Sequence, residues 1–240
     1  MLINNPFYNF CLRTTALWIG LVLFLVFSTP IVFASDHDFE LWTWENFWIN
    51  LSDLGLPDNT NLYLENANRF DQDASHLFQF HQRIGIKFDI PWFEGWSIMP
   101  VWQHVDYEPG SNEERYHLDL TYARKNLFDS KWSMKFRCRL DLRDKEDKDH
   151  ISERLRPKLS FSHPLPIQID GRPVKICFSN EINYDTVVDK FNRHRFGTEF
   201  KIPLTKVMTW GIGYQIETNR LSNNSWDSDS MLMTGFSFRF

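Results

Sequence analysis

Long apolar runs are scarce in this chain of 240 residues. The longest, Ala16–Phe27, holds about a dozen residues, whereas a helix that spans a membrane needs roughly 20. No later stretch comes close to that length, and no segment shows a helical period of hydrophobicity over a useful distance. These absences exclude a helical membrane protein from the leading interpretations and leave strands as the principal elements.

Cysteine is also scarce, with three residues in the whole chain. Cys11 lies ahead of the apolar run, where it is badly placed for a lipoprotein cleavage site. Cys138 and Cys177 fall on opposite faces of different predicted strands, so we expect no disulfide between them. An exported protein could form one, but the geometry disfavours it.

Positive charge is in deficit. Lysine and arginine together number 26, against 31 acidic residues, for a net charge of −5. This balance argues against general nucleic-acid binding. Aromatic residues, by contrast, make up 16% of the chain and include ten tryptophans. Such rings suit the girdles of a membrane barrel, although a soluble β-sandwich with an aromatic core is an alternative.

The first 34 residues resemble a secretory signal. A polar start with a positive charge at Arg13 precedes the apolar run, Ser28-Thr29-Pro30 breaks that run, and Val32-Phe33-Ala34 ends in a small residue. This pattern predicts cleavage after Ala34. The alternative is a retained membrane helix, which the shortness of the apolar run disfavours.

The rest of the chain alternates between extended segments and turns, which predicts an all-β fold. We expect a transmembrane, antiparallel, up-and-down β-barrel over residues 60–240, with about ten strands and twelve as the alternative count. The predicted strands are Thr60–Phe70, Ser75–Phe88, Trp96–Tyr107, Glu114–Lys125, Lys131–Arg143, Ile151–Ser162, Val174–Tyr184, Phe191–Ile202, Val207–Asn219 and Ser230–Phe240. Residues 35–59 form a Trp-rich segment that does not alternate cleanly. Because counting it would give an odd number, we place it outside the barrel wall.

The connections between these strands differ in character. Those at Glu108–Glu113, Asp144–His150, Asp185–Lys190 and Leu221–Asp229 are polar and resemble outward loops, whereas those at Phe88–Gly95, Asn126–Ser130 and Ile202–Lys206 are aromatic or short and resemble periplasmic turns. The connection His163–Pro173 falls on the periplasmic side but is long, and it contains three prolines.

Several strands place charge on one face and apolar groups on the other. A soluble barrel would point the apolar face inward, and a membrane barrel inverts this arrangement. We choose the inverted arrangement because of the predicted signal, the aromatic content and the closing strand. Arginine facing lipid at mid-strand would cost about 2–4 kcal/mol, so we expect ion pairs to brace the lumen. The candidates are Arg83, Asp119, Arg137, Arg139, Asp141, Arg143, Arg154, Arg156, Glu181, Arg193, Arg195, Glu199 and Glu217.

The last predicted strand, Ser230–Phe240, ends on an aromatic residue. A long apolar edge invites aggregation in a soluble protein, whereas the last strand of a closed membrane barrel has no free edge. Phe236, Phe238 and Phe240 on one face of this strand resemble the signal by which bacterial outer-membrane barrels are recognised for assembly.

Scattered motifs from about Leu62 to Phe240 resemble one protein family. They are Asn112–Arg115 before a strand, Arg137–Arg143, Arg154–Arg156, Ser179–Ile182, Phe191–Arg195 followed by Gly197, and Gly213–Tyr214. In this order they are similar to the bacterial outer-membrane proteins grouped as domain of unknown function 2490, although Asp141 stands where the family suggests glutamate. The resemblance implies an outer-membrane β-barrel and brings no established activity or cofactor.

No set of residues in the chain has the spacing of a catalytic triad. Ser162 neighbours His163 but points to the other face of its strand, and His104 and His117 have no matching serine. The spacings also predict no metal ligands and no cofactor. The sequence therefore predicts a structural or transport-type outer-membrane protein whose lumen is closed or a narrow pore. The alternatives are an enzyme that modifies lipid or lipopolysaccharide and a soluble β-barrel that binds an apolar ligand. The expected partners are outer-membrane lipid and lipopolysaccharide, the barrel-assembly machinery, periplasmic chaperones and small solutes, and no nucleic acid.

Overall fold

Eleven strands and two short 3-10 turns account for nearly all of the chain that the structure describes. This computed structural model describes residues 39–240 apart from 73, 109, 187–188 and 222–224. The predicted signal over residues 1–34 lies outside the described residues. The strands are β1 (Phe39–Asn50), β2 (Asn61–Asp71), β3 (His76–Asp89), β4 (Trp96–Tyr107), β5 (Glu113–Arg124), β6 (Ser133–Lys145), β7 (Ser152–Ile169), β8 (Arg172–Asp185), β9 (Lys190–Pro203), β10 (Met208–Arg220) and β11 (Trp226–Arg239), and the 3-10 turns are η1 (Ser52–Leu54) and η2 (Leu127–Asp129).

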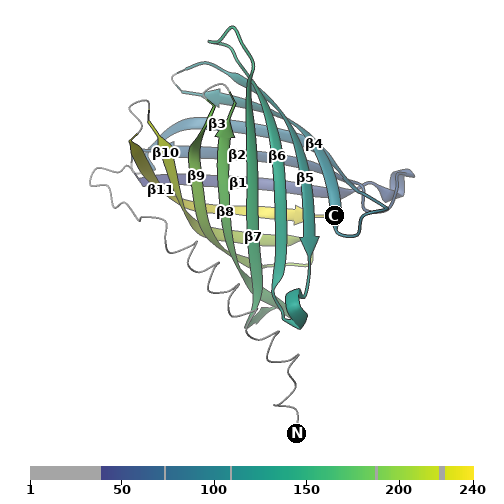
Figure 1. Ribbon diagram of the computed structural model, residues 1–240. Coiled ribbons are helices and arrows are strands. Elements are labelled where there is room, and N and C mark those ends of the chain that lie inside the picture. The colour runs from purple at the N-terminus through teal and green to yellow at the C-terminus, as the bar shows by residue number, and fades with distance from the viewer. Residues whose placement is uncertain (1–38, 73, 109, 187–188, 222–224) are drawn as a thin grey trace, which may run out of the picture. The chain divides into compact units, whose positions relative to one another are not determined.

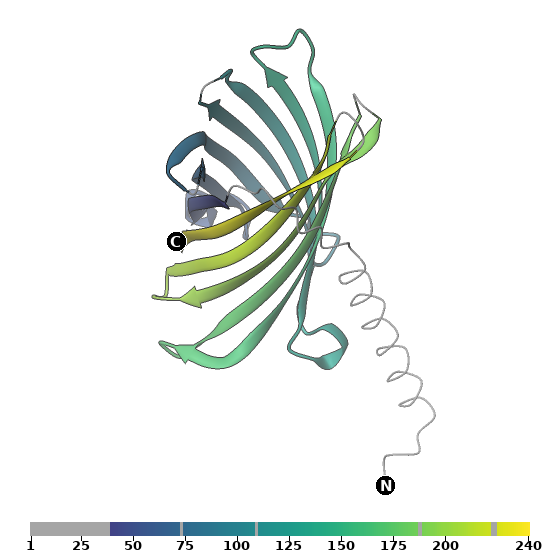
Figure 2. The ribbon, with the colours of Figure 1, turned by 90° about the vertical axis from the view of Figure 1, so that its left-hand side faces the viewer.

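The strands close into one barrel in which each strand pairs with its neighbours along the chain. In Figure 1, β5 to β8 run upright across the front, while β1, β2 and β11 run across behind them. From the side, the strands bow around a common interior (Figure 2). Every sequential pair is antiparallel, and the barrel closes where β1 and β11 pair in parallel, with Phe39 opposite Ser230 and Trp48 opposite Arg239. The fold is thus an all-β, closed barrel.

The prediction of ten strands, and of twelve as the alternative, is wrong because the Trp-rich segment belongs to the wall. Its residues 39–50 form β1, which pairs with β11 over residues 39–48 and with β2 over residues 41–50. The expectation of an even number of strands is wrong for the same reason. The segment shows no clear alternation of polar and apolar residues because bulky apolar side chains occupy both faces: Trp42 and Trp44 lie on one face, and Leu41 and Phe47 lie on the other.

Small residues on the neighbouring strands make room for the inward tryptophans. A Cβ atom on Gly235 would overlap the backbone and indole of Trp44, and one on Gly211 would lie 2.8 Å from Cζ2 of the same ring. Farther along β1, the rings of Trp48 and Tyr63 pack with centroids 4.5 Å apart. The aromatic side chains of β1 therefore pack into space that is available because Gly211 and Gly235 have no side chain.

The long connection that we expected at His163–Pro173 is also wrong. Strands β7 and β8 continue as a hairpin to a tight turn at Asp170 and Gly171, which both have positive φ. A shift of register between Pro164 and Gln168 takes up the prolines, which cannot donate to the ladder.

The two ends of the barrel differ in chemistry. We call "polar end" the end that holds the connections at 72–75, 108–112, 146–151, 186–189 and 221–225, and "aromatic end" the end that holds those at 51–60, 90–95, 125–132, 170–171 and 204–207. Exposed side chains of Trp92, Phe93, Phe128 and Phe240 lie at the aromatic end. Strand β1 begins at the polar end and β11 finishes at the aromatic end, because the two strands are parallel.

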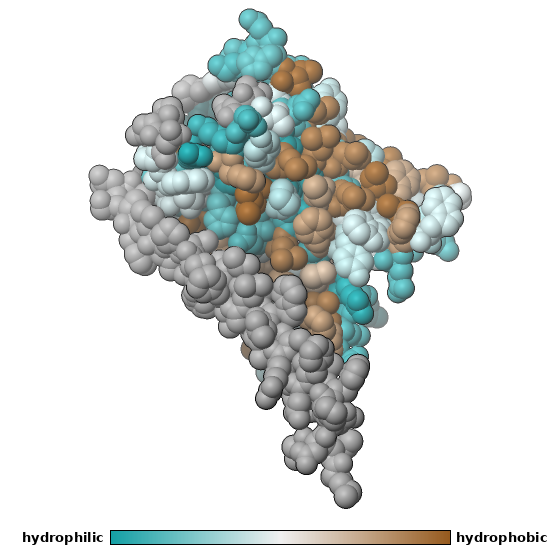
Figure 3. Space-filling model, viewed as in Figure 1, coloured by the Kyte–Doolittle hydropathy of each residue, from teal (hydrophilic) through white to brown (hydrophobic). Residues whose placement is uncertain are grey.

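Charged side chains point into the barrel and apolar side chains point out of it. Arg139 and Asp141 are 4% and 1% exposed, whereas their neighbour Leu140 is 41% exposed. The same contrast recurs on β5, where Asp119 is buried between the exposed Leu118 and Leu120. Figure 3 shows brown apolar side chains over the middle of the front wall and teal polar ones on the β6–β7 loop at the top. None of the described segments forms a helix long and apolar enough to cross a membrane.

Candidate functional site

The candidate site is the interior of the barrel, which is built from alternate residues of each strand. Cross-strand register sets its first contacts, since Asp119 lies opposite Arg139 and His117 lies opposite Asp141. Arg139 holds Asp119 in a two-pronged contact, with Nε 2.6 Å from Oδ1 and Nη2 2.8 Å from Oδ2. Paired guanidinium donors of this kind fix both geometry and charge.

Arg156 of β7 joins two carboxylates at the centre of the interior. Its Nη1 lies 2.9 Å from Oδ2 of Asp141, and its Nη2 lies 2.6 Å from Oε1 of Glu181. Asp141 also contacts the ring of His117, whose other nitrogen lies 2.7 Å from Oε1 of Gln103. All five of these residues are buried, so this central cluster links β4, β5, β6, β7 and β8.

The central cluster continues around the wall to β10. Glu181 accepts a hydrogen bond from Arg137 at 2.5 Å and lies 3.3 Å from Nη1 of Arg195. Arg195 in turn bonds to Glu217 at 2.5 Å, and Arg193 lies 3.2 Å from the same carboxylate. On this side of the barrel, Glu181 and Glu217 together pair with four arginines. Each buried charge therefore has a partner of opposite sign, which offsets the cost of its burial.

Sequence reasoning missed several members of this interior network. Glu113, which we placed in a loop, is the first residue of β5, is 1% exposed and contacts both Arg143 and Arg115. Asp185, also assigned to a loop, lies 3.0 Å from Arg154. Because both carboxylates stand at strand ends, small errors in the predicted boundaries removed them from the candidate set.

A second group was missed on the β1–β2 side of the interior, where only the loss of Glu40 follows from leaving β1 out of the wall. Glu40 of β1 lies 2.5 Å from Arg69 of β2, whose guanidinium also lies 5.6 Å from the ring centre of Trp42. Glu65 lies 2.6 Å from Arg83 and 3.6 Å from His81. The alternation of β2 would have found Glu65 and Arg69, since both share a face with the buried Ala67.

All thirteen lumen candidates of the sequence analysis lie on inward faces, but they do not all join the central cluster. Glu199 pairs with Lys201 at 3.5 Å rather than with an arginine. Phe236 and Phe238 point outward from β11, and Phe240 follows that strand. The backbone amide of Phe240 donates to Trp48, and its carbonyl accepts from Asn50. Cys138 on β6 and Cys177 on β8 are free.

Buried inward residues line the interior at mid-height nearly all the way round. They include Ala67, His81, Gln103, His117, Asp141, Arg156, Glu181, Gln215 and Met231, from β2 to β8 and from β10 and β11. They are buried although they point into the barrel, so other side chains cover them at this level. We call these residues the central layer.

Toward the aromatic end, the interior of β6 to β9 changes from paired arginines to lysines. We call Lys135, Lys158, Lys175 and Lys201 the lysine vestibule. Lys175 lies opposite Lys201, Lys158 lies opposite Arg137, and Lys135 shares the inward face of β6 with Arg137. Within the described part of the chain, Lys201 alone of the four makes an ion pair. Lys135, Lys175 and Lys201 are exposed, so this part of the interior is open to water.

No three histidine, cysteine or acidic residues of the described segments come together in a way that could hold a metal ion. Fold and interior together define a closed eleven-stranded β-barrel braced by buried ion pairs. The family described as "Protein of unknown function (DUF2490)" matches residues 39–228, and the chain belongs to it. The match begins at the first residue of β1, in agreement with the place of that strand in the wall. No curated protein and no solved structure matches the chain.

Proposed function

We propose that this protein is an outer-membrane β-barrel of structural type, closed at its centre, whose open vestibule favours small anions. One observation carries the proposal: the wall is inverted, with exposed leucines outside and buried arginine–carboxylate pairs inside. Lipid solvates an apolar outer surface, while water does not. A soluble barrel has the reverse arrangement.

The two ends of the barrel support an orientation in the membrane. The aromatic end, with the exposed rings of Trp92, Phe93 and Phe128, suits the periplasmic surface of the membrane. The polar end then faces lipopolysaccharide. Export by a signal over residues 1–34 and folding by the barrel-assembly machinery complete the proposal.

Cell fractionation tests the location. We expect the protein in the outer-membrane fraction, resistant to extraction by aqueous buffer and by alkaline carbonate. On a gel, the unheated protein should migrate differently from the boiled protein, as folded barrels do. Recovery in the aqueous fraction would refute the membrane proposal and favour a soluble barrel.

The lysine vestibule favours anions over cations as candidate solutes, because rings of lysine or arginine can select anions. In planar bilayers we expect no steady conductance from the wild type, since the central layer is closed. Arg156→Ala combined with Glu181→Ala removes both sides of the central pair and should open an anion-preferring conductance. Lys135→Glu with Lys158→Glu in that background should weaken the preference, and an unchanged preference would remove the vestibule from the proposal.

A further inference from the structure

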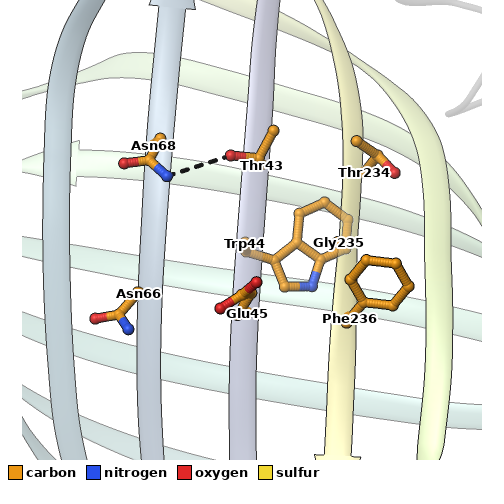
Figure 4. Close-up of a pocket in the computed structure, with 8 residues that line it drawn as sticks. All are labelled: Thr43, Trp44, Glu45, Asn66, Asn68, Thr234, Gly235 and Phe236. Carbon is orange, nitrogen blue, oxygen red and sulfur yellow. Dashed lines mark hydrogen bonds between the residues drawn. The ribbon is translucent and has the colours of Figure 1, made fainter.

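A patch of polar side chains interrupts the apolar outer wall beside the junction of β1 and β11. We call Thr43, Glu45, Asn66, Asn68 and Gln82 the outer polar patch. These residues alternate with inward ones such as Trp44, Ala67 and His81, and so point outward. Figure 4 shows the side chains of four of them, on β1 and β2, around a hollow of about 270 Å³ that is also lined by Thr234 and Phe236.

The outer polar patch lies at mid-strand rather than at a rim. Glu45 stands opposite Asn66, Asn66 opposite Gln82, and Gln82 opposite His104, so the polar row continues across four strands. At similar positions on β5 and β6 the outward residues are leucines, such as Leu118 and Leu140. In a barrel that spans a membrane, the patch would face hydrocarbon, where carboxylate and amide groups are unfavourable.

Hydrogen bonds within the outer polar patch leave much of its capacity unused. Asn68 donates to Thr43 and Gln82 donates to Asn66, each over 3.4 Å, which is long for a hydrogen bond. Among the described residues, the carboxylate of Glu45 has no hydrogen bond or ion pair, and the amide nitrogen of Asn66 donates to nothing. An unused acceptor and an unused donor therefore lie side by side on adjacent strands.

We propose that the outer polar patch is the contact surface between two copies of this chain in the membrane. This inference rests on the proposed function, because only lipid makes an uncovered patch unfavourable. The patch is self-complementary: a two-fold axis between Glu45 and Asn66 brings the carboxylate of each copy to the amide of the other. Carboxamides and hydroxyls are the groups that join protein surfaces within membranes, and a partner of different sequence would have to supply the same groups in the opposite order.

Cross-linking in isolated outer membranes tests the pairing. The probe is Thr43→Cys, which lies in the patch and leaves Glu45 and Asn66 in place. It is made in a chain whose other cysteines are serine and treated with a short bis-maleimide. The matched control keeps Cys138 as the sole cysteine, because it also points outward but lies on β6, away from the patch. We expect a band of twice the chain mass from Thr43→Cys and none from Cys138. Equal cross-linking, no cross-linking, or a product of another mass would overturn the proposal.

The mass of the detergent-solubilised protein gives a second measurement. Wild type should contain two chains, and Glu45→Leu with Asn66→Leu should halve the mass while the shift between heated and unheated bands persists. Glu153→Leu is the control, since it removes an exposed carboxylate from β7 and should keep the two-chain mass. A wild type of one chain, or a double variant that stays at two, would refute the pairing. Recovery of wild type in the aqueous fraction would instead refute the proposed function.

Discussion

At the scale of single residues, the interior is organised by carboxylates that each serve more than one cation. Glu181 contacts Arg137, Arg156 and Arg195, and Asp141 contacts Arg156 and lies 4.0 Å from Nε of Arg139. Burying a charge is costly unless it is paired, so the loss of one partner costs more than the pair contributes. These ion pairs join side chains from different strands, so together they fix the positions of the strands relative to one another.

The central cluster predicts a large loss of stability for Arg156→Met. The substitution leaves Asp141 and Glu181 buried with fewer cations, and should lower the free energy of unfolding by about 3–5 kcal/mol. Denaturant titration of the folded protein in detergent measures this change. Lys148→Met is the control: its pair with Asp147 spans 3.7 Å with both side chains half exposed, so it should change stability by about 0–1 kcal/mol. Equal losses in the two variants would contradict the role of the cluster.

Alternation alone was enough to put the thirteen candidates on one face, but it could not assign partners. Glu199 was expected to brace arginines and instead lies beside Lys201, because both project from β9 below the central cluster. Glu113 and Asp185 needed strand boundaries accurate to a single residue. Partner choice depends on register across strands, which one sequence does not state.

At the scale of elements, β1 and β11 depend on each other. Strand β1 supplies rings to the interior, and β11 supplies Gly235 beneath Trp44. The strand pattern was recognised wherever polarity alternated, and it failed at β1, where aromatic residues occupy both faces. It also failed in the β7–β8 hairpin, where prolines suggested a loop but a register shift accommodates them within the ladder.

The end of β11 predicts a defect in assembly for Phe240→Asp. The backbone bonds of Phe240 to Trp48 and Asn50 can persist, but the ring, 60% exposed at the aromatic end, is replaced by a charge. We expect the folded, heat-modifiable form to be lost from the outer membrane. Phe128→Asp is the control, because it also removes an exposed ring at that end, at a positive φ that aspartate tolerates. Normal insertion of Phe240→Asp would contradict an assembly role for this residue.

At the scale of the whole molecule, the odd strand count separates the two ends of the wall. Phe39 lies at the polar end, and Phe240 lies at the aromatic end. Closed-barrel architecture and the inward charge were accessible from the sequence because both follow from alternation with period two. The number of strands was not accessible in this way. The prediction of ten assumed an even number, whereas a barrel whose first and last strands pair in parallel has an odd number.

Labelling from the two sides of the membrane tests the proposed orientation. In a chain with no other cysteine, Lys148→Cys at the polar end should react with an impermeant maleimide on intact cells. Asp170→Cys, in the turn at the aromatic end, should react only after the outer membrane is permeabilised. The reverse pattern would invert the barrel, and equal labelling of both would argue against a membrane-spanning wall.

The parallel junction between β1 and β11 also has a kinetic consequence. All other neighbours in the barrel are consecutive along the chain, so hairpins can form and add in turn, whereas this junction joins residues as distant as Phe39 and Ser230. Contacts between segments that are remote in sequence require the largest loss of chain entropy before their favourable interactions form. Parallel ladders are also slightly less stable per residue than antiparallel ones. We therefore expect the junction to form last, so that the time this barrel needs to fold is set by the meeting of its first and last strands.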